Sequence, residues 1–194
     1  MTHVHEELLA LAARLVVEEG LDYRGAKQRA VKSLGLGART PLPDNEALDD
    51  AVREYLAVFC ADTQPQELAA LRRLALQWMQ RMAAFRPHLT GAVWQGTATR
   101  LSDVMIQLYC DDPKSAEIAL IDAGVPFEAR NADGPRGEPV PALSVHARCA
   151  DWHESVGVHF IVLDRDDLRT APRADAKGRP LRGDVAAVQA LLEA

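Results

Sequence analysis

One stretch of the sequence constrains the fold more than any other, and it runs from Leu89 to Asp112. An apolar run turns at Gly91, a loop of small residues follows, and Ser102-Asp103 opens an alternating run from Val104 to Cys110. Short apolar runs bounded by glycine are typical of β-strands. A glycine turn followed by an acid at the mouth of a strand can bring backbone amides and a metal-binding carboxylate to one phosphate group. We therefore predict two strands here, with a phosphate site between them.

Residues 1–86 are expected to be helical, because apolar residues recur at helical spacing. Asp22 and either Asp44 or Asn45 stand where helix N-caps belong, and Pro87 should end the last helix. The predicted helices extend to Gly20, from Tyr23 to Leu34, from Asp44 or Asn45 to Phe59, and from Thr63 to Phe85. Three short helices with a basic second one allow a helix-turn-helix module, whereas a plain helical bundle needs no such role.

The remaining residues alternate between strand and helix patterns. One helix is predicted from Asp112-Pro113 to Ala123, and a last helix follows Asp184. Strand patterns lie at 125–129, 140–148 and 156–163, the last two as neighbours, and residues 165–183 are expected to form a polar surface loop or tail. The predicted fold class is α+β: a helical domain at 1–86, then a small mixed β-sheet flanked by helices at 87–194.

The composition of the 194 residues is that of a folded globular protein, with 48% hydrophobic and 26% charged residues. The net charge of −6 gives no overall bias toward nucleic acid. Cys60, Cys110 and Cys149 lack the spacing of a zinc site or disulfide framework, which is typical of a reducing compartment. The first residues lack the basic region of a signal peptide, and no apolar run approaches the ~20 residues that span a bilayer. We therefore expect a cytoplasmic protein with no membrane partner.

Two windows of the sequence, residues 23–43 and 68–102, contain basic residues and no acids. Such asymmetry can build a positive face on an acidic protein. Both windows are therefore candidate contacts for RNA or another nucleic acid. The alternative is a solvated surface that is balanced by acids brought nearby in the fold.

The segment from Gly91 to Asp103 resembles the signature of the nucleotidyltransferase superfamily, whose fold is that of DNA polymerase beta. In that signature a Gly-Ser or Gly-Gly turn precedes an Asp-x-Asp or Asp-x-Glu strand by roughly ten residues. Here Gly91-Ala92 occupies the turn and Ser102-Asp103 the start of the strand motif. The resemblance implies that a nucleotide triphosphate binds and that Asp103 is the catalytic ligand of Mg²⁺. The implied nucleotide- and phosphate-binding residues are Gly91, Ala92, Gly96, Thr97, Thr99, Arg100 and Ser102.

The same resemblance implies three carboxylates that hold two Mg²⁺ ions. Side chains alternate along a strand, so Met105 stands where the second carboxylate belongs. The third position falls on His159, and Asp164 is the nearest alternative acid. A thioether and an imidazole are poor ligands for a hard cation. One carboxylate with the substrate's phosphates can hold a single Mg²⁺ weakly, which is the cofactor content we expect.

Two interpretations of function follow from these residues. The first is Mg²⁺-dependent nucleotide binding, with transfer of a nucleoside monophosphate to an unidentified acceptor if the degenerate metal site is active. The alternative is a catalytically inactive nucleotidyltransferase fold that acts as a nucleic-acid- or protein-binding module. A third class, a transition-metal enzyme, would draw on His146, His153 and His159.

Overall fold

The computed structural model describes residues 2–37, 39–170 and 173–193. The chain divides into two compact units, which are described separately here. The helical unit comprises Met1–Leu68 together with Thr97–Leu101, and the sheet unit comprises Ala69–Gly96 together with Ser102–Ala194. No helix in the described ranges is both long and apolar enough to cross a membrane.

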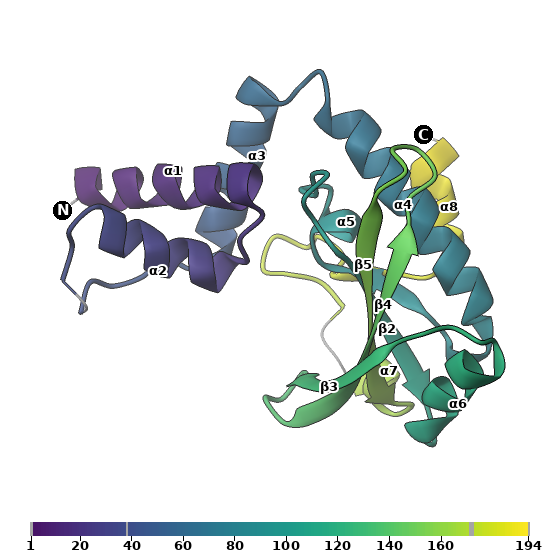
Figure 1. The fold of residues 1–194 in the computed structure, drawn as a ribbon. Coiled ribbons are helices and arrows are strands. Elements are labelled where there is room, and N and C mark those ends of the chain that lie inside the picture. Colours follow the sequence, from purple (N-terminus) through teal and green to yellow (C-terminus); the bar gives the residue numbers. More distant parts are fainter. Residues whose placement is uncertain (1, 38, 171–172, 194) are drawn as a thin grey trace. The chain divides into compact units, whose positions relative to one another are not determined.

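The helical unit is built on three helices whose beginnings are set by local chemistry (Figure 1). They are α1 Thr2–Glu19, α2 Tyr23–Ser33 and α3 Asn45–Phe59. The Asp22 carboxylate accepts the Gly25 N–H at the start of α2, and Asp44 accepts the Ala47 N–H at the start of α3. Such caps satisfy N–H groups that a helix leaves without partners. The apolar faces of the three helices meet in one buried core.

Helix α4, Gln64–Arg81, is shorter than predicted. The chain tightens into a short 3₁₀ helix, η1 Ala83–Phe85, and Arg86 then takes a left-handed conformation with φ 48°. Most of α4 belongs to the sheet unit, which differs from the boundary predicted at residue 86. The physical reason is the apolar stripe of α4. Trp78 lies edge-on to Phe160 of the sheet, with ring centroids 5.8 Å apart.

The sheet is mixed and has the strand order β3-β4-β5-β2-β1-β6. Its strands are β1 His88–Thr90, β2 Val104–Cys110, β3 Glu128–Asp133, β4 Pro139–Arg148, β5 Ser155–Asp164 and β6 Arg182–Gly183. Strands β2 and β5 are parallel, and the other neighbours are antiparallel. The remaining helices are α5 Gly91–Gln95, α6 Lys114–Asp122, α7 Asp167–Thr170 and α8 Val185–Glu193. The predicted α+β class is confirmed.

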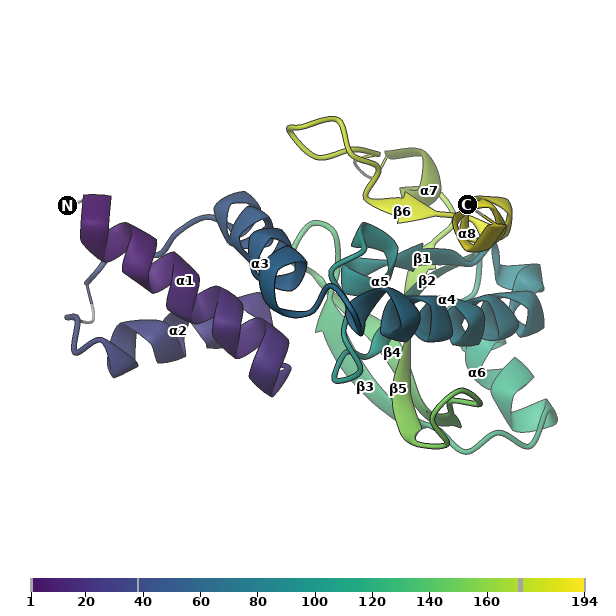
Figure 2. The same ribbon diagram turned by 90° about the horizontal axis from the view of Figure 1, so that it is seen from above.

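The two faces of the sheet differ in chemistry because side chains alternate along each strand. One face carries the buried Val104, Ile106 and Phe160, and it packs against α4 and α6. Figures 1 and 2 both show α4 running alongside the strands. The opposite face carries Tyr109 and Leu163, which pack with Leu168 of α7 at one end. At its other end this face carries Asp103, Met105, His159 and Ser144, and we call this group of residues the Asp103 face.

Three segments differ from the sequence-based predictions. The strand expected at 125–129 begins only at Glu128 and continues to Asp133, because Pro126 has no N–H to donate to a ladder. The turn predicted at Gly91 begins the short helix α5, which continues to Gln95. The polar tract 165–183 contains α7 and strand β6, which pairs with β1. Residues 171–172 of that tract lie outside the described residues.

Candidate functional site

The strand register places a row of side chains across the Asp103 face. Met105 is the partner of His159 on β5 and of Thr90 on β1. His159 is in turn the partner of Ser144 on β4. Because all four are direct cross-strand partners, their side chains lie on the same face of the sheet. Asp103 immediately precedes β2 and contacts Gly157, two residues before His159.

Asp103 is held by two donors, one for each carboxylate oxygen. Its Oδ1 accepts the Gly157 N–H at 3.2 Å, and its Oδ2 lies 3.0 Å from His159 Nε2. The hydrogen bond from His159 is the largest cause that lowers the pKa of Asp103 below its ordinary value. Burial acts in the opposite direction, and the Gly157 N–H adds to the lowering. The side chain is still 57% exposed, so Asp103 presents an ionised carboxylate to solvent at neutral pH.

The hydrogen-bond roles of the two ring nitrogens of His159 follow from their neighbours. Its Nδ1 lies 2.9 Å from Arg130 Nη2 and 2.8 Å from Ser144 Oγ. A guanidinium group can only donate, so Nδ1 must be an acceptor. With Nδ1 as the acceptor, Nε2 carries the N–H that donates to Asp103. Arg130, His159 and Asp103 form a chain of hydrogen bonds in which Arg130 polarises the His159 ring and so strengthens the hydrogen bond to the carboxylate.

Gly157 is part of this site although the sequence analysis did not select it. A Cβ atom on Gly157 would lie 2.6 Å from Asp103 Oδ1 and 2.8 Å from its Cγ. Only glycine leaves the carboxylate room to reach the strand backbone. An isolated glycine inside the strand pattern at 156–163 was the available signal, since such glycines mark a close approach.

The glycine turn lies beside the same row. Gly91 has φ 70°, a left-handed conformation that favours glycine, and it begins α5 directly after β1. Its Cβ position would be 3.5 Å from Met105 Cγ, so the turn and β2 are in contact. Ala92 follows in the same helix, and Gly96 ends it with φ 86°. The structure thus brings the Gly91-Ala92 turn alongside β2, the strand that begins directly after Asp103.

The other predicted phosphate-binding residues belong to the helical unit. Thr97 and Thr99 are buried there, with 4% and 7% of their surface exposed, so they do not present their hydroxyl groups to solvent. The Arg100 N–H donates to Glu67, and Ala98 C=O accepts from Gln64. These bonds tie the segment to the start of α4. Ser102 begins the return into the sheet unit, next to Asp103.

The residues of the Asp103 face do not fit a centre that holds two metal ions. Asp103 is the one carboxylate among the three expected positions, and His159 turns an N–H toward it rather than a lone pair. Asp164 pairs with Cys110 at the far end of β5, seven residues beyond Gly157. That separation is about 23 Å along a strand, so Asp164 is not a partner of Asp103. The described residues contain no group of three or more His, Cys, Asp or Glu side chains that could hold a metal, the three histidines included.

Several residues of the basic windows contribute to the structure of their own unit. In the first, the buried Lys27 ammonium donates to Pro43 C=O, and Arg29 pairs with Glu19. In the second, Arg72 donates to the backbone of α5, and Arg73 pairs with Asp151. These basic residues have partners within their own units, which fits the alternative of a balanced surface.

Comparison with known proteins gives a partial similarity. No family model matches the chain, and no curated protein matches it. Among solved structures it is similar to the Cid1 poly(U) polymerase bound to MgGTP, with 14% identity and a TM-score of 0.37 over 57% of this chain and 38% of that one. It is also similar to a cytoplasmic RNA terminal U-transferase, with 16% identity and a TM-score of 0.37 over 61% and 39%. The chain thus matches well under half the length of these proteins. The proposals below rest on the geometry of the site and not on this similarity.

Proposed function

We propose that the Asp103 face binds a nucleoside triphosphate together with the Mg²⁺ ion that the nucleotide carries. The observation that supports this most is the state of Asp103, an ionised and exposed carboxylate at the mouth of β2. The Gly91-Ala92 turn lies beside β2, so a phosphate chain and its cation can be bound by one edge of the sheet. Carboxylate oxygens are the ligands that Mg²⁺ prefers in proteins, usually one or two together with substrate phosphates.

Binding without efficient nucleotidyl transfer fits this geometry best. A two-metal reaction needs ligands for both ions, one at the attacking oxygen and one at the leaving oxygen. Met105 and His159 occupy the positions where the further carboxylates are expected, and neither supplies negative charge. We therefore favour a nucleotidyltransferase-like sheet that retains nucleotide binding and has lost its second metal site.

The proposal is tested by calorimetry of ATP, CTP, GTP and UTP, each with and without Mg²⁺ or Mn²⁺. We expect metal-dependent binding of at least one nucleotide, and its loss in an Asp103→Ala variant. The matched control is Asp164→Ala, which removes an acid from the far end of β5 and should leave binding unchanged.

Two results would contradict the proposal. Equal binding by wild type and Asp103→Ala would place the nucleotide elsewhere. Absence of binding under every metal condition would mean that the glycine turn and Asp103 serve the architecture of the sheet alone.

A further inference from the structure

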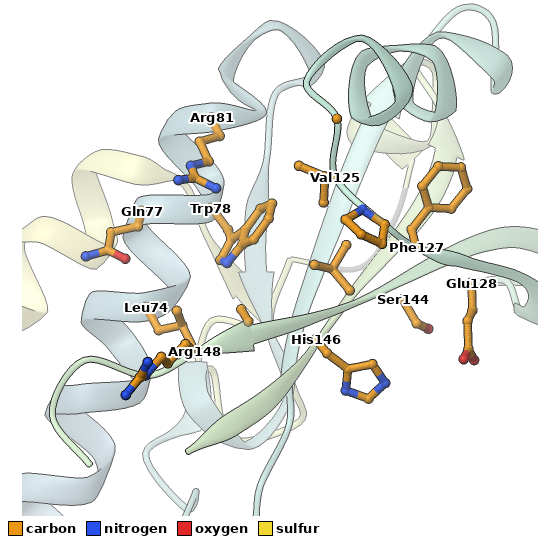
Figure 3. Close-up of a pocket in the computed structure, with 14 residues that line it drawn as sticks. Leu74, Gln77, Trp78, Arg81, Val125, Phe127, Glu128, Ser144, His146 and Arg148 are labelled. Atoms are coloured by element: carbon orange, nitrogen blue, oxygen red, sulfur yellow. The ribbon is translucent and has the colours of Figure 1, made fainter. Parts of the chain in front are cut away.

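A pocket of about 570 Å³ opens where β3 and β4 separate (Figure 3). Strand β3 begins at Glu128, opposite Ser144, whereas β4 continues to Arg148. Beyond Ser144 the outer edge of β4 therefore has no strand partner within the described residues, while its inner edge stays paired with β5. An open strand edge presents a row of N–H and C=O groups that can pair with another chain.

Apolar side chains line this pocket on two sides. On one side α4 contributes Leu74 and Trp78, and on the other lies the segment Val125–Phe127 (Figure 3). Val145 and Ala147 of β4 are buried, so alternate residues of the open edge face the apolar side of the sheet. A strand that paired with this edge would lie about 4.8 Å from β4 and place its own alternate side chains over the same surface.

The pocket carries an excess of positive charge. The Arg81 guanidinium lies over the Trp78 ring, 4.8 Å from its centroid, and Arg148 ends β4. Within the described residues neither side chain takes part in a hydrogen bond or an ion pair. Glu128 is the one acid that lines the pocket, at the point where the β3–β4 ladder begins. Two cations against one acid in this groove favour an anionic partner.

We propose that an extended acidic peptide segment binds here as an added strand on the edge of β4. Its backbone pairs with residues 145–148, and its apolar side chains cover Leu74 and Trp78. Its acidic side chains alternate to the other side of the added strand, toward Arg148, and the charge of Arg81 adds to the attraction. Main-chain pairing gives affinity in such complexes, and the pockets for alternate side chains give specificity. A phosphate or an RNA strand would use the two arginines but would leave the row of strand amides without partners. The proposal is independent of nucleotide binding at Asp103.

The test uses a fluorescein-labelled peptide, Glu-Val-Glu-Val-Glu-Val-Glu, and measures its binding to the full chain by fluorescence anisotropy. Two further peptides carry backbone N-methyl groups, one on every valine and one on every internal glutamate. Successive N–H groups of a strand point to opposite edges, so one methylated peptide should lose at least roughly tenfold in affinity while the other binds normally. The double variant Arg81→Gln, Arg148→Gln should bind about fivefold more weakly. Arg24→Gln, an exposed arginine of the helical unit, is the matched control and should bind as wild type does.

Three results would overturn the proposal. Equal affinity for all three peptides would show that backbone pairing is not used. No binding of the unmodified peptide would show that the edge is closed to strands. Arginine-dependent binding of inorganic phosphate or an oligouridylate, without peptide binding, would make the pocket a site for a phosphate-bearing ligand instead.

Discussion

Replacing Gly157 by alanine tests the central geometric claim about the site. The added Cβ would lie 2.6 Å from Asp103 Oδ1, well inside the 3.4 Å at which ordinary contact begins. The backbone of β5 cannot yield easily, because it pairs with β2 on one side and β4 on the other. The carboxylate must therefore move by about 1 Å, which breaks its bonds to the Gly157 N–H and to His159.

The cost of this change can be bounded from the structure. A hydrogen bond to a charged group contributes about 1.5–3 kcal/mol, but Asp103 is 57% exposed and water replaces part of each loss. We take about 1 kcal/mol for each of the two bonds. Replacing glycine within a strand returns about 0.5–1 kcal/mol through backbone entropy. The free energy of unfolding of Gly157→Ala should thus fall by about 1 kcal/mol, and nucleotide binding should weaken more strongly.

The assay is urea unfolding of a double-mutant cycle with Asp103→Ala. In that background the clash is absent, so Gly157→Ala should be neutral or slightly stabilising. An NMR titration of the Asp103 carboxyl in the single variant should show its pKa rising toward the ordinary value. The reasoning is refuted if Gly157→Ala costs the same free energy with and without Asp103.

Three further changes should behave as follows. In His159→Ala the pKa of Asp103 should rise, because its largest lowering cause is gone. In the wild type the folded state holds the pKa of Asp103 below its unfolded value, so this carboxylate contributes stability above about pH 4 that is lost as the pH falls through the folded pKa. The difference in unfolding free energy between pH 7 and pH 3, measured with urea, should therefore be smaller in the variant. Trp78→Ala should destabilise the sheet unit by about 3–5 kcal/mol in the same assay, because it leaves a cavity against Phe160. Lys27→Met should lower the unfolding free energy by about 1–3 kcal/mol, measured by thermal unfolding, because the buried Pro43 C=O and the Asn45 Oδ1 lose their donor.

Features governed by neighbours in the sequence were predictable. Asp22 and Asp44 cap their helices as expected, because capping needs only residues three positions apart. Strand β2 was placed at its observed bounds, since a strand with one buried face alternates clearly. The membership of α4 in the sheet unit was not predictable, because an apolar stripe does not say which surface it covers.

The residues of the candidate site also divide into those that the sequence could indicate and those that it could not. The resemblance to the nucleotidyltransferase signature selected Asp103 and His159, and the structure brings these two together. Their roles toward nucleotide and metal stay predictions. Arg130 and Ser144 were not selected, because both reach His159 only through the pairing register of β4 and β3. Register depends on contacts between distant segments and has no local signature here.

The hydrogen bonds from Arg130 to His159 and from His159 to Asp103 compensate the negative charge of the Asp103 carboxylate. Clustered carboxylates repel one another, and metal ions normally offset that repulsion. Here Asp103 is a single carboxylate, and His159, polarised by Arg130, supplies the compensating donor. A magnesium ion arriving with a nucleotide must therefore compete with the His159 N–H for Oδ2, or bind through the lone pairs that remain free. The donor that stabilises the Asp103 carboxylate is thus also the group that, under the proposed function, would weaken its hold on a metal ion.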